Sequence, residues 1–339
     1  MPDHAPDNAH RQAAWSRYWK QGALHSLPGS YSGNYAGPIE RFWIDNFATL
    51  GRGRRMLDIA TGNGPIPQLA CAYCDGRDAG MPRIDAIDLA QVAPVWVPSQ
   101  PASCREALHF HPGVSAESLP FDDASFDLVT SQYGIEYCDD DRTAPEVARV
   151  LAPGGRVALL LHHADSRLVQ VAREELRLAD WLLRPAGFLD DLEAIAPWIR
   201  QATTAEGRAA LRDHADAHRA RDAFNRGMQS LAAEVAASPF PDLLEEARSF
   251  AAQALASLKD RSMDDVLALV RSYRDNLVDA RLRYAELCEC AMDTDRLEAF
   301  TARLRAHGVS NARHAPIHHD NGLLMGWTLT AGKESGPGA

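Results

Sequence analysis

The sequence is poor in cysteine and in positive charge, and it has no long apolar run. Six cysteines in 339 residues are too few for a disulfide framework. Lys and Arg number 35 against 46 Asp and Glu, so the formal net charge is −11, and a surface of that sign repels nucleic-acid phosphates. No apolar run approaches the roughly 20 residues that span a bilayer.

The amino-terminal stretch also differs from an export signal. It carries acids and histidines where such a signal has basic residues followed by an apolar core. Hydrophobic residues make up 46% and charged residues 24%, a balance that excludes a chain disordered throughout. We therefore expect a soluble cytoplasmic protein without nucleic-acid or membrane partners.

Short apolar runs alternate with loops and helical stretches through residues 46–165, which we expect to form a ligand-binding core. The runs lie at 56–60, 84–90, 126–132 and 156–163. This rhythm is typical of strand–helix–strand units. Because the runs are apolar almost throughout, they suit strands that are buried on both faces of a parallel sheet. The sequence therefore predicts an α/β fold with a mostly parallel sheet.

The pattern becomes helical from 166 to 292. Leu168, Ala172 and Leu176 begin a series at steps of four and three, the spacing of one helical face. We expect a large α-helical insertion here, which either roofs a substrate site or forms a homodimer interface. Residues 293–331 are predicted to add a helix and strands that complete the core, and 332–339 to be a disordered tail.

Residues 1–45 are rich in aromatic side chains, including Trp15, Tyr18, Trp19 and Tyr31. Aromatic side chains close a site against water at low entropic cost. We interpret this segment as a lid over a ligand; the alternative is that it simply covers the sheet.

A glycine-rich turn follows the first apolar run. Gly62 and Gly64 allow the backbone to approach a ligand closely. A nucleotide phosphate loop would continue with Lys and Ser or Thr, which do not follow here, and a dinucleotide turn would have glycine where Pro67 stands. Asp58 at the strand end would repel a pyrophosphate. The remaining ligand class has a positive amino-acid end and a ribose.

Asp88 ends the next apolar run. A carboxylate at this place can accept hydrogen bonds from both ribose hydroxyls. Its position supports the same ligand class.

Four segments in order resemble the class I S-adenosylmethionine-dependent methyltransferases. They are LDIATGNG at 57–64, AIDLA at 86–90, SAESLPFDDASFDLVTSQYGIEY at 115–137 and EVARVLAPGGRVALLL at 146–161. The resemblance implies a doubly wound, Rossmann-like methyltransferase sheet carrying the helical insertion. It also implies S-adenosyl-L-methionine as cofactor and S-adenosyl-L-homocysteine as product.

The resemblance also assigns the cofactor-binding residues. The methionine part is expected to lie against Asp58, Ala60, Gly62 and Gly64, and the ribose on Asp88. The adenine is expected to lie against Leu89, Ser115, Ala116 and Glu117. Gln132 is expected beneath the cofactor, near its methyl group. Many relatives carry an acid where this chain has Ser115, whose hydroxyl can still accept a hydrogen bond.

Catalytic candidates lie at the carboxyl ends of the apolar runs at 126–132 and 156–163. Methyl transfer from a sulfonium mainly requires alignment and exclusion of water, and a base is needed only for an acceptor that holds its proton firmly. Tyr133, His162 and His163 should lie near the reacting atoms, and histidine titrates near neutrality. The alternative is that the histidines are hydrogen-bonded strand ends.

Two other pairs of residues do not predict a metal site. Cys71 and Cys74 have no second pair at zinc spacing and are expected to be structural thiols. His214 and His218 lack the acid of a metalloprotease helix. The sequence predicts a methyltransferase acting on an O, N or C atom of a small organic molecule; the alternative is a non-catalytic cofactor-binding or scaffold protein.

Overall fold

The computed structural model describes residues 8–26 and 33–335. The chain divides into two compact units. The first comprises Met1–Val169 and Glu286–Ala339, and the second comprises Gln170–Ala285. Among the described residues, no helix is both long and apolar enough to cross a membrane.

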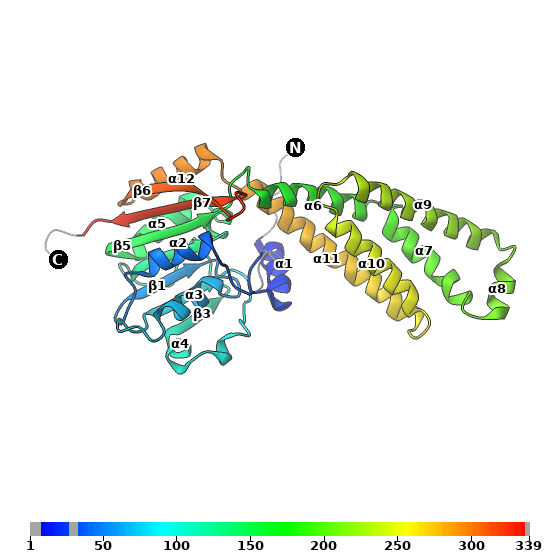
Figure 1. Cartoon of the computed structure of the whole chain (residues 1–339), viewed down its shortest axis with the longest axis horizontal. Helices are drawn as coiled ribbons and strands as arrows, with labels where there is room; N and C mark the ends of the chain where they lie inside the picture. The colour runs from blue at the N-terminus through cyan, green and yellow to red at the C-terminus, as the bar shows by residue number, and fades with distance from the viewer. Residues whose placement is uncertain (1–7, 27–32, 336–339) are drawn as a thin grey trace. The chain divides into compact units, whose positions relative to one another are not determined.

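The first unit is built on a seven-stranded sheet with strand order β3-β2-β1-β4-β5-β7-β6 (Figure 1). The strands are β1 (Arg55–Ile59), β2 (Arg83–Asp88), β3 (Leu108–Pro112), β4 (Phe126–Gln132), β5 (Leu151–Leu161), β6 (Val309–His318) and β7 (Leu324–Lys333). Neighbours from β3 to β5 run parallel, whereas β7 is antiparallel to β5 and β6. The predicted doubly wound, mostly parallel sheet is confirmed.

Helices cover both faces of the sheet. α2 (Pro38–Phe47), α3 (Pro65–Cys74) and α4 (Ala102–Ala107) contribute to one hydrophobic cluster. α5 (Asp140–Val150) and α12 (Thr294–Ala306) contribute to the other. The remaining elements of this unit are α1 (Asn8–Lys20) and the short 3-10 helices η1 (Val97–Ser99) and η2 (Ile135–Tyr137).

Strand β5 shows why the central strands are apolar on both sides. Val157, Leu159 and Leu161 pack in the α5 and α12 cluster, while Ala158 and Leu160 pack in the α2 and α3 cluster. Side chains alternate between the two faces of a strand. A strand between two helical layers therefore needs an apolar residue at nearly every position.

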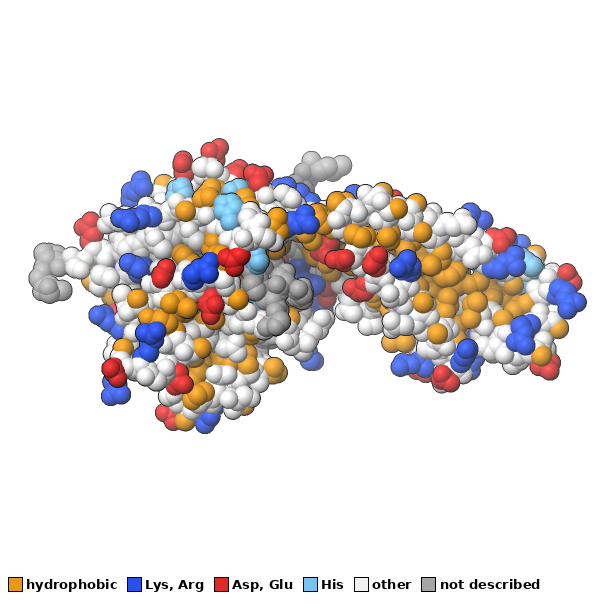
Figure 2. Space-filling view, viewed as in Figure 1, with side chains coloured by type: hydrophobic (Ala, Val, Ile, Leu, Met, Phe, Trp, Pro, Cys, Tyr) orange, Lys and Arg blue, Asp and Glu red, His pale blue; other side chains and the backbone are white. Residues whose placement is uncertain are grey.

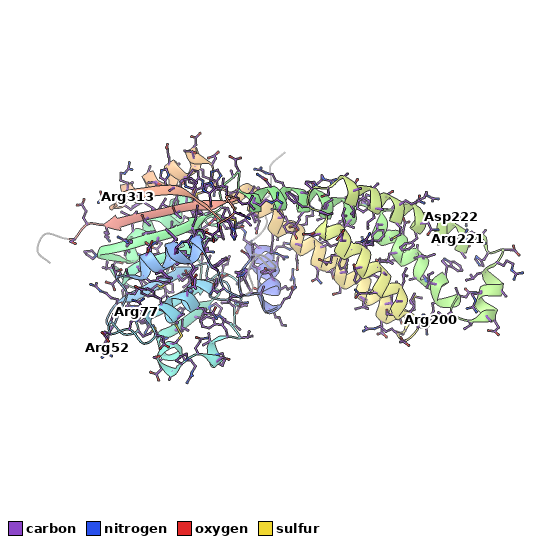
Figure 3. All side chains as sticks on the ribbon, viewed as in Figure 1. Arg52, Arg77, Arg200, Arg221, Asp222 and Arg313 are labelled. Atoms are coloured by element: carbon purple, nitrogen blue, oxygen red, sulfur yellow. A yellow bond between two sulfur atoms is a disulfide. The ribbon has the colours of Figure 1, made fainter. Side chains whose placement is uncertain are left out.

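The second unit is helical. Its elements are α6 (Arg167–Leu183), α7 (Phe188–Gln201), α8 (Ala205–Leu211), α9 (Ala215–Ala237), α10 (Asp242–Ser257) and α11 (Met263–Cys290), of which α6 begins and α11 ends in the first unit. Its core includes Phe188 and Leu231, and hydrophobic side chains gather over these helices in Figure 2. Arg200, labelled in Figure 3, donates from Nη1 to the carbonyl oxygen of Arg261 at 2.6 Å, which joins α7 to the turn after α10.

Two expectations about individual residues are wrong. Cys71 is not a thiol but forms a disulfide with Cys104, because α3 and α4 bring the two Cα atoms to 5.7 Å across 33 residues of sequence. Cys74 remains a buried thiol. The predicted disordered tail begins too early, since β7 extends to Lys333, whose ammonium donates to the carbonyl oxygens of Ala148 and Leu151. Residues 336–339 lie outside the described residues.

Phe300 of α12 is fully buried against the sheet, so Phe300→Ala should lower the free energy of unfolding by about 3–5 kcal/mol through lost apolar contacts and an unfilled cavity. Urea denaturation measures this change. Glu298→Ala, at an exposed position on the same helix, is the control and should stay within about 0.5 kcal/mol of the wild type. Equal effects of the two substitutions would contradict this packing.

Candidate functional site

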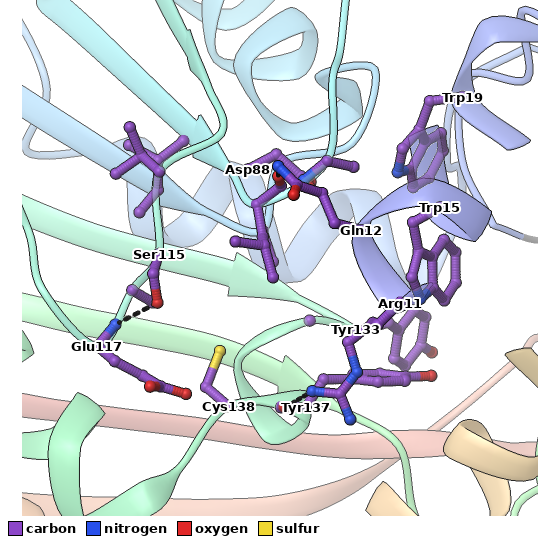
Figure 4. Close-up of a pocket in the computed structure, with 17 residues that line it drawn as sticks. Arg11, Gln12, Trp15, Trp19, Asp88, Ser115, Glu117, Tyr133, Tyr137 and Cys138 are labelled. Carbon is purple, nitrogen blue, oxygen red and sulfur yellow. Dashed lines mark hydrogen bonds between the residues drawn. The ribbon is translucent and has the colours of Figure 1, made fainter. Parts of the chain in front are cut away.

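A cavity opens at the carboxyl ends of the parallel strands, where ligands bind in open α/β sheets (Figure 4). Its volume is about 910 Å³ when the space at its open mouth is included. The residues that line it come from α1, from the loops after β1, β2 and β3, and from the segment after β4: Arg11, Gln12, Trp15, Trp19, Ala60, Ile87, Asp88, Leu89, Ala90, Val114, Ser115, Ala116, Glu117, Tyr133, Gly134, Tyr137 and Cys138.

The turn after β1 has the backbone conformation that its glycines permit. Gly62 has φ 54° and Gly64 has φ 75°, both in the left-handed region that favours glycine. A Cβ added at Gly62 would lie 2.6 Å from the ring of Trp19, and one at Gly64 would lie 2.7 Å from the ring of Phe110. Aromatic rings of the chain itself therefore lie against this turn, and of the residues predicted here only Ala60 lines the cavity.

Asp88 joins the turn after β1 to the loop after β2. Its Oδ2 accepts a hydrogen bond from the amide of Gly62 at 2.7 Å, and its Oδ1 accepts one from the amide of Ala90 at 2.8 Å. Burial raises the pKa of Asp88 to about 6, against the opposing effect of the two amides. Each carboxylate oxygen has a second lone pair. Asp88 lines the cavity and can therefore still accept hydrogen bonds from ligand hydroxyls.

Asp58 lies beneath the turn and does not line the cavity. Its carboxylate is 1% exposed and accepts hydrogen bonds from the hydroxyls of Thr61 at 2.6 Å and Thr130 at 2.7 Å. Burial raises the pKa of Asp58 to about 7, although the two hydroxyls act in the opposite direction. Near neutral pH this carboxyl is therefore only partly ionised.

The residues predicted to border an adenine meet at the cavity. Leu89 and the segment Ser115–Glu117 all line it. The carboxylate of Glu117 accepts from the amide of Asp139 at 3.2 Å and pairs with Arg142 at 2.7 Å. The Glu117 side chain is therefore fixed at the rim by neighbouring residues.

The aromatic amino-terminal segment divides between two roles. Trp15 and Trp19 of α1 line the cavity, as a lid would. Tyr35 and Trp43 instead belong to the hydrophobic core beside α2 and α3, which is the alternative interpretation. Tyr31 lies outside the described residues.

Gln132, the last residue of β4, and Tyr133, which follows it, differ in their relation to the cavity. The Gln132 Oε1 accepts a hydrogen bond from the Trp43 indole at 2.5 Å, and this side chain does not line the cavity. Tyr133 lines it with φ 53°, a strained conformation for a non-glycine residue. Its hydroxyl donates to the carbonyl oxygen of Met325 at 3.1 Å.

His162 and His163 are the predicted bases, and neither lines the cavity. His162 is 1% exposed, its Nδ1 lies 2.8 Å from the Oε1 of Glu136, and its ring stacks on Tyr133 at 4.3 Å between centroids. Its Nε2 has no hydrogen-bond partner among the described residues.

His163 stacks on Trp327 at 4.3 Å between ring centroids, and burial lowers its pKa. Its Nδ1 accepts from the amide of Asp165 at 3.0 Å. This placement corrects the expectation for His163: the end of β5 directs it toward β7 rather than toward the cavity.

Several residues of the cavity wall were not predicted from the sequence. Arg11 shares a four-residue spacing with Trp15 and Trp19 on α1, a signal that could have identified it. Tyr137 and Cys138, in the segment after β4, also line the cavity. Within the described part of the chain, no group of three or more His, Cys, Asp or Glu residues could hold a metal ion.

The comparison with known families agrees with this geometry. A model of the methyltransferase domain family matches residues 57–159, which include the glycine turn, Asp88 and Ser115–Glu117. The part of the chain that carries the predicted cofactor residues is therefore similar to a methyltransferase domain.

Individual relatives of the methyltransferase domain match part of the chain. The malonyl-[acyl-carrier protein] O-methyltransferase of Erwinia billingiae is 35% identical over 124 residues, 36% of this chain and 45% of that protein. The mitochondrial 2-methoxy-6-polyprenyl-1,4-benzoquinol methylase of Drosophila melanogaster is 31% identical over 150 residues, 39% of this chain and 49% of that protein. The chain thus spans less than half the length of these curated relatives.

A solved structure shows a partial likeness to the chain. Geranyl diphosphate C-methyltransferase from Streptomyces coelicolor A3(2) is similar over 47% of this chain and 67% of that one, at 17% identity and a TM-score of 0.35.

The residues present fit the nucleoside end of S-adenosylmethionine. Asp88, Leu89 and Ser115–Glu117 all open to one cavity. Trp19 covers Gly62, where the methionine end is expected. Accommodation of the whole cofactor therefore requires this indole to shift.

The raised pKa of Asp58 makes the stability of the domain depend on pH. A carboxyl whose folded pKa is about 7, against an ordinary value of 3.8, stabilises the fold when protonated and loses this contribution as the pH rises between these values. Asp58→Asn should therefore gain stability relative to wild type by about 3 kcal/mol between about pH 4 and pH 7. Urea denaturation across this range measures the difference. The exposed Asp78→Asn serves as the control, and a parallel profile for Asp58→Asn and wild type would contradict the assignment.

Proposed function

We propose that the protein transfers the methyl group of S-adenosyl-L-methionine to an O, N or C atom of a small organic molecule and releases S-adenosyl-L-homocysteine. The observation that carries the proposal is the cavity that Asp88 and Ser115–Glu117 line together with aromatic residues of α1 and of the segment after β4. When bound, the cofactor supplies an activated methyl group, so the protein has to align the acceptor and exclude water.

The cofactor contacts proposed for this chain follow the cavity wall. Asp88 would accept the ribose hydroxyls, and Leu89 with Ser115–Glu117 would border the adenine. The methionine part would lie toward Gly62, above the carboxyl of Asp58. The two oxygens of Asp88 already hold the amides on either side, which fixes them in place before a ligand arrives.

Aromatic side chains would orient the acceptor. Trp15, Tyr133 and Tyr137 line the cavity beside the ends of β4 and α1. The hydroxyl of Tyr133 is engaged by Met325, and burial raises the pKa of Tyr137 well above its ordinary value. These tyrosines therefore suit the role of walls that exclude water better than that of proton acceptors.

His162 does not line the cavity, so it is not placed to take a proton from an acceptor bound there. It packs on Tyr133, and Glu136 holds its Nδ1. These contacts fix the imidazole beside Tyr133, and we propose that His162 positions this tyrosine.

The charge of the chain and the substrates named for two relatives support the proposal of a small organic acceptor. The formal net charge of −11 disfavours nucleic acids as partners. The similar proteins named above act on an acyl-carrier-bound malonyl group and on a benzoquinol. The second unit of this chain is proposed to act either as a substrate cap or as a homodimer interface.

Asp88→Ala should weaken binding of S-adenosyl-L-homocysteine at least about 10-fold, since hydrogen bonds to a charged group contribute roughly 1.5–3 kcal/mol. Isothermal titration calorimetry measures the affinity. Asp122→Ala, at an exposed position away from the cavity, is the matched control and should bind like wild type. If Asp88→Ala bound S-adenosyl-L-homocysteine as tightly as wild type, Asp88 would not be a ligand-binding residue.

A screen of small hydroxyl, amine and activated-carbon acceptors should reveal release of S-adenosyl-L-homocysteine that depends on both the acceptor and the wild-type protein. Mass spectrometry of the product would identify the methylated atom. Cofactor binding without turnover on any acceptor would favour the alternative, a non-catalytic cofactor-binding or scaffold protein.

A further inference from the structure

A buried carboxylate holds α1 against the cavity. Oε1 of Glu286 accepts a hydrogen bond from Arg11 Nε at 2.5 Å, and Oε2 accepts one from Trp15 Nε1 at 3.0 Å. The Glu286 side chain is only 2% exposed. Both oxygens of one buried group are therefore engaged by side chains that line the cavity.

The charge of Arg11 is neutralised by this contact. Besides pairing with Glu286, Arg11 donates from Nη1 to the carbonyl oxygen of Tyr137 at 3.2 Å (Figure 4). An arginine that is paired with a buried carboxylate has little net charge to offer an anionic ligand. Arg11 therefore suits the role of a clamp on α1 better than that of a receptor for a ligand carboxylate.

Further hydrogen bonds tie α1 to the loops that hold the predicted cofactor residues. Gln12 donates to the carbonyl oxygen of Leu89 at 2.8 Å, and the amide of Gln91 donates to the Ser16 hydroxyl at 2.9 Å. Asn63, between the two glycines of the turn, donates to the carbonyl oxygen of Trp19 at 2.9 Å. These neutral contacts are individually weaker than the buried ion pair.

The position of Trp19 makes this attachment relevant to ligand exchange. Its ring lies 2.6 Å from the place of a Cβ at Gly62, so it occupies the space beside the turn. A ligand can reach this turn only when the indole moves. Because Trp15 and Trp19 belong to one helix, a displacement of α1 would move both from the cavity.

We propose that the Arg11–Glu286 pair is a latch that holds α1 closed over the cavity, and that opening of this latch controls exchange of S-adenosylmethionine and S-adenosylhomocysteine. The proposal rests on the proposed function. Glu286 is a positioning residue: it acts through Arg11 and Trp15 and does not itself line the cavity. A weakened latch should increase the open fraction of α1, which speeds both association and dissociation of the ligand.

The test is stopped-flow tryptophan fluorescence with S-adenosyl-L-homocysteine as the probe. Glu286→Gln keeps the shape of the side chain and removes its charge. We expect a dissociation rate about 10-fold higher than wild type, together with an increased association rate constant. Glu289→Gln, at an exposed position near the same end of α11, is the matched control and should leave both rates unchanged.

Arg11→Gln provides a second route to the same result. It should raise both the association and the dissociation rate. In the double variant Arg11→Gln/Glu286→Gln, the change in the logarithm of each rate should be smaller than the sum of the two single changes, because both substitutions act on one interaction. Circular dichroism spectra and thermal unfolding verify that each variant is folded. If Glu286→Gln fails to fold, the rates measured for Arg11→Gln test the latch proposal.

The outcomes separate this proposal from the proposed function. Rates equal to wild type in the folded variants, or a slower association with unchanged dissociation, would overturn the latch while leaving the methyltransferase proposal intact. If wild type binds no S-adenosyl-L-homocysteine while the protein is folded, the proposed function fails and the latch fails with it.

Discussion

The hydrogen bonds of the buried Asp88 carboxylate are the interaction on which the rest of the cavity depends. The parallel ladder between β1 and β2 ends with the pair Ile59 and Ile87, and beyond it the amide of Thr61 donates to the carbonyl oxygen of Ile87 at 2.9 Å. Asp88 adds a side-chain connection by accepting one amide from the turn after β1 and one from the loop after β2. A side chain that cannot accept hydrogen bonds would lose this connection between the glycine turn and the loop that carries Leu89. The Asp88 carboxylate, which is proposed to bind the ribose hydroxyls, thus also fixes the shape of the site.

A second constraint comes from the amino-terminal helix. The cavity has its floor on the sheet, but part of its wall belongs to α1, which precedes the methyltransferase domain in the sequence. Such a wall must be attached firmly enough to exclude water and weakly enough to admit a ligand. In the proposed latch, the buried Glu286 carboxylate with its two donors would meet both requirements, because Arg11 and Trp15 belong to α1 and not to a strand of the sheet.

The sequence predicts the central strands because burial on both faces requires continuous apolar runs, and β1, β2, β4 and β5 carry them. Most residues of the strands β3 and β6 are partly buried or exposed, so these strands lack the continuous apolar run that predicts the central ones. The turn and Asp88 could be predicted because their chemistry is local. The directions of His162 and His163, the Cys71–Cys104 pairing and the place of Glu286 depend on distant segments, which local spacing does not determine.

The crystal structure of the protein with S-adenosyl-L-homocysteine tests the central claim most directly. The account predicts the adenine between Leu89 and Ser115–Glu117, the ribose hydroxyls on Asp88, and the Trp19 indole displaced from Gly62. A ligand bound elsewhere on the chain, or a ribose held by groups other than Asp88, would contradict the account.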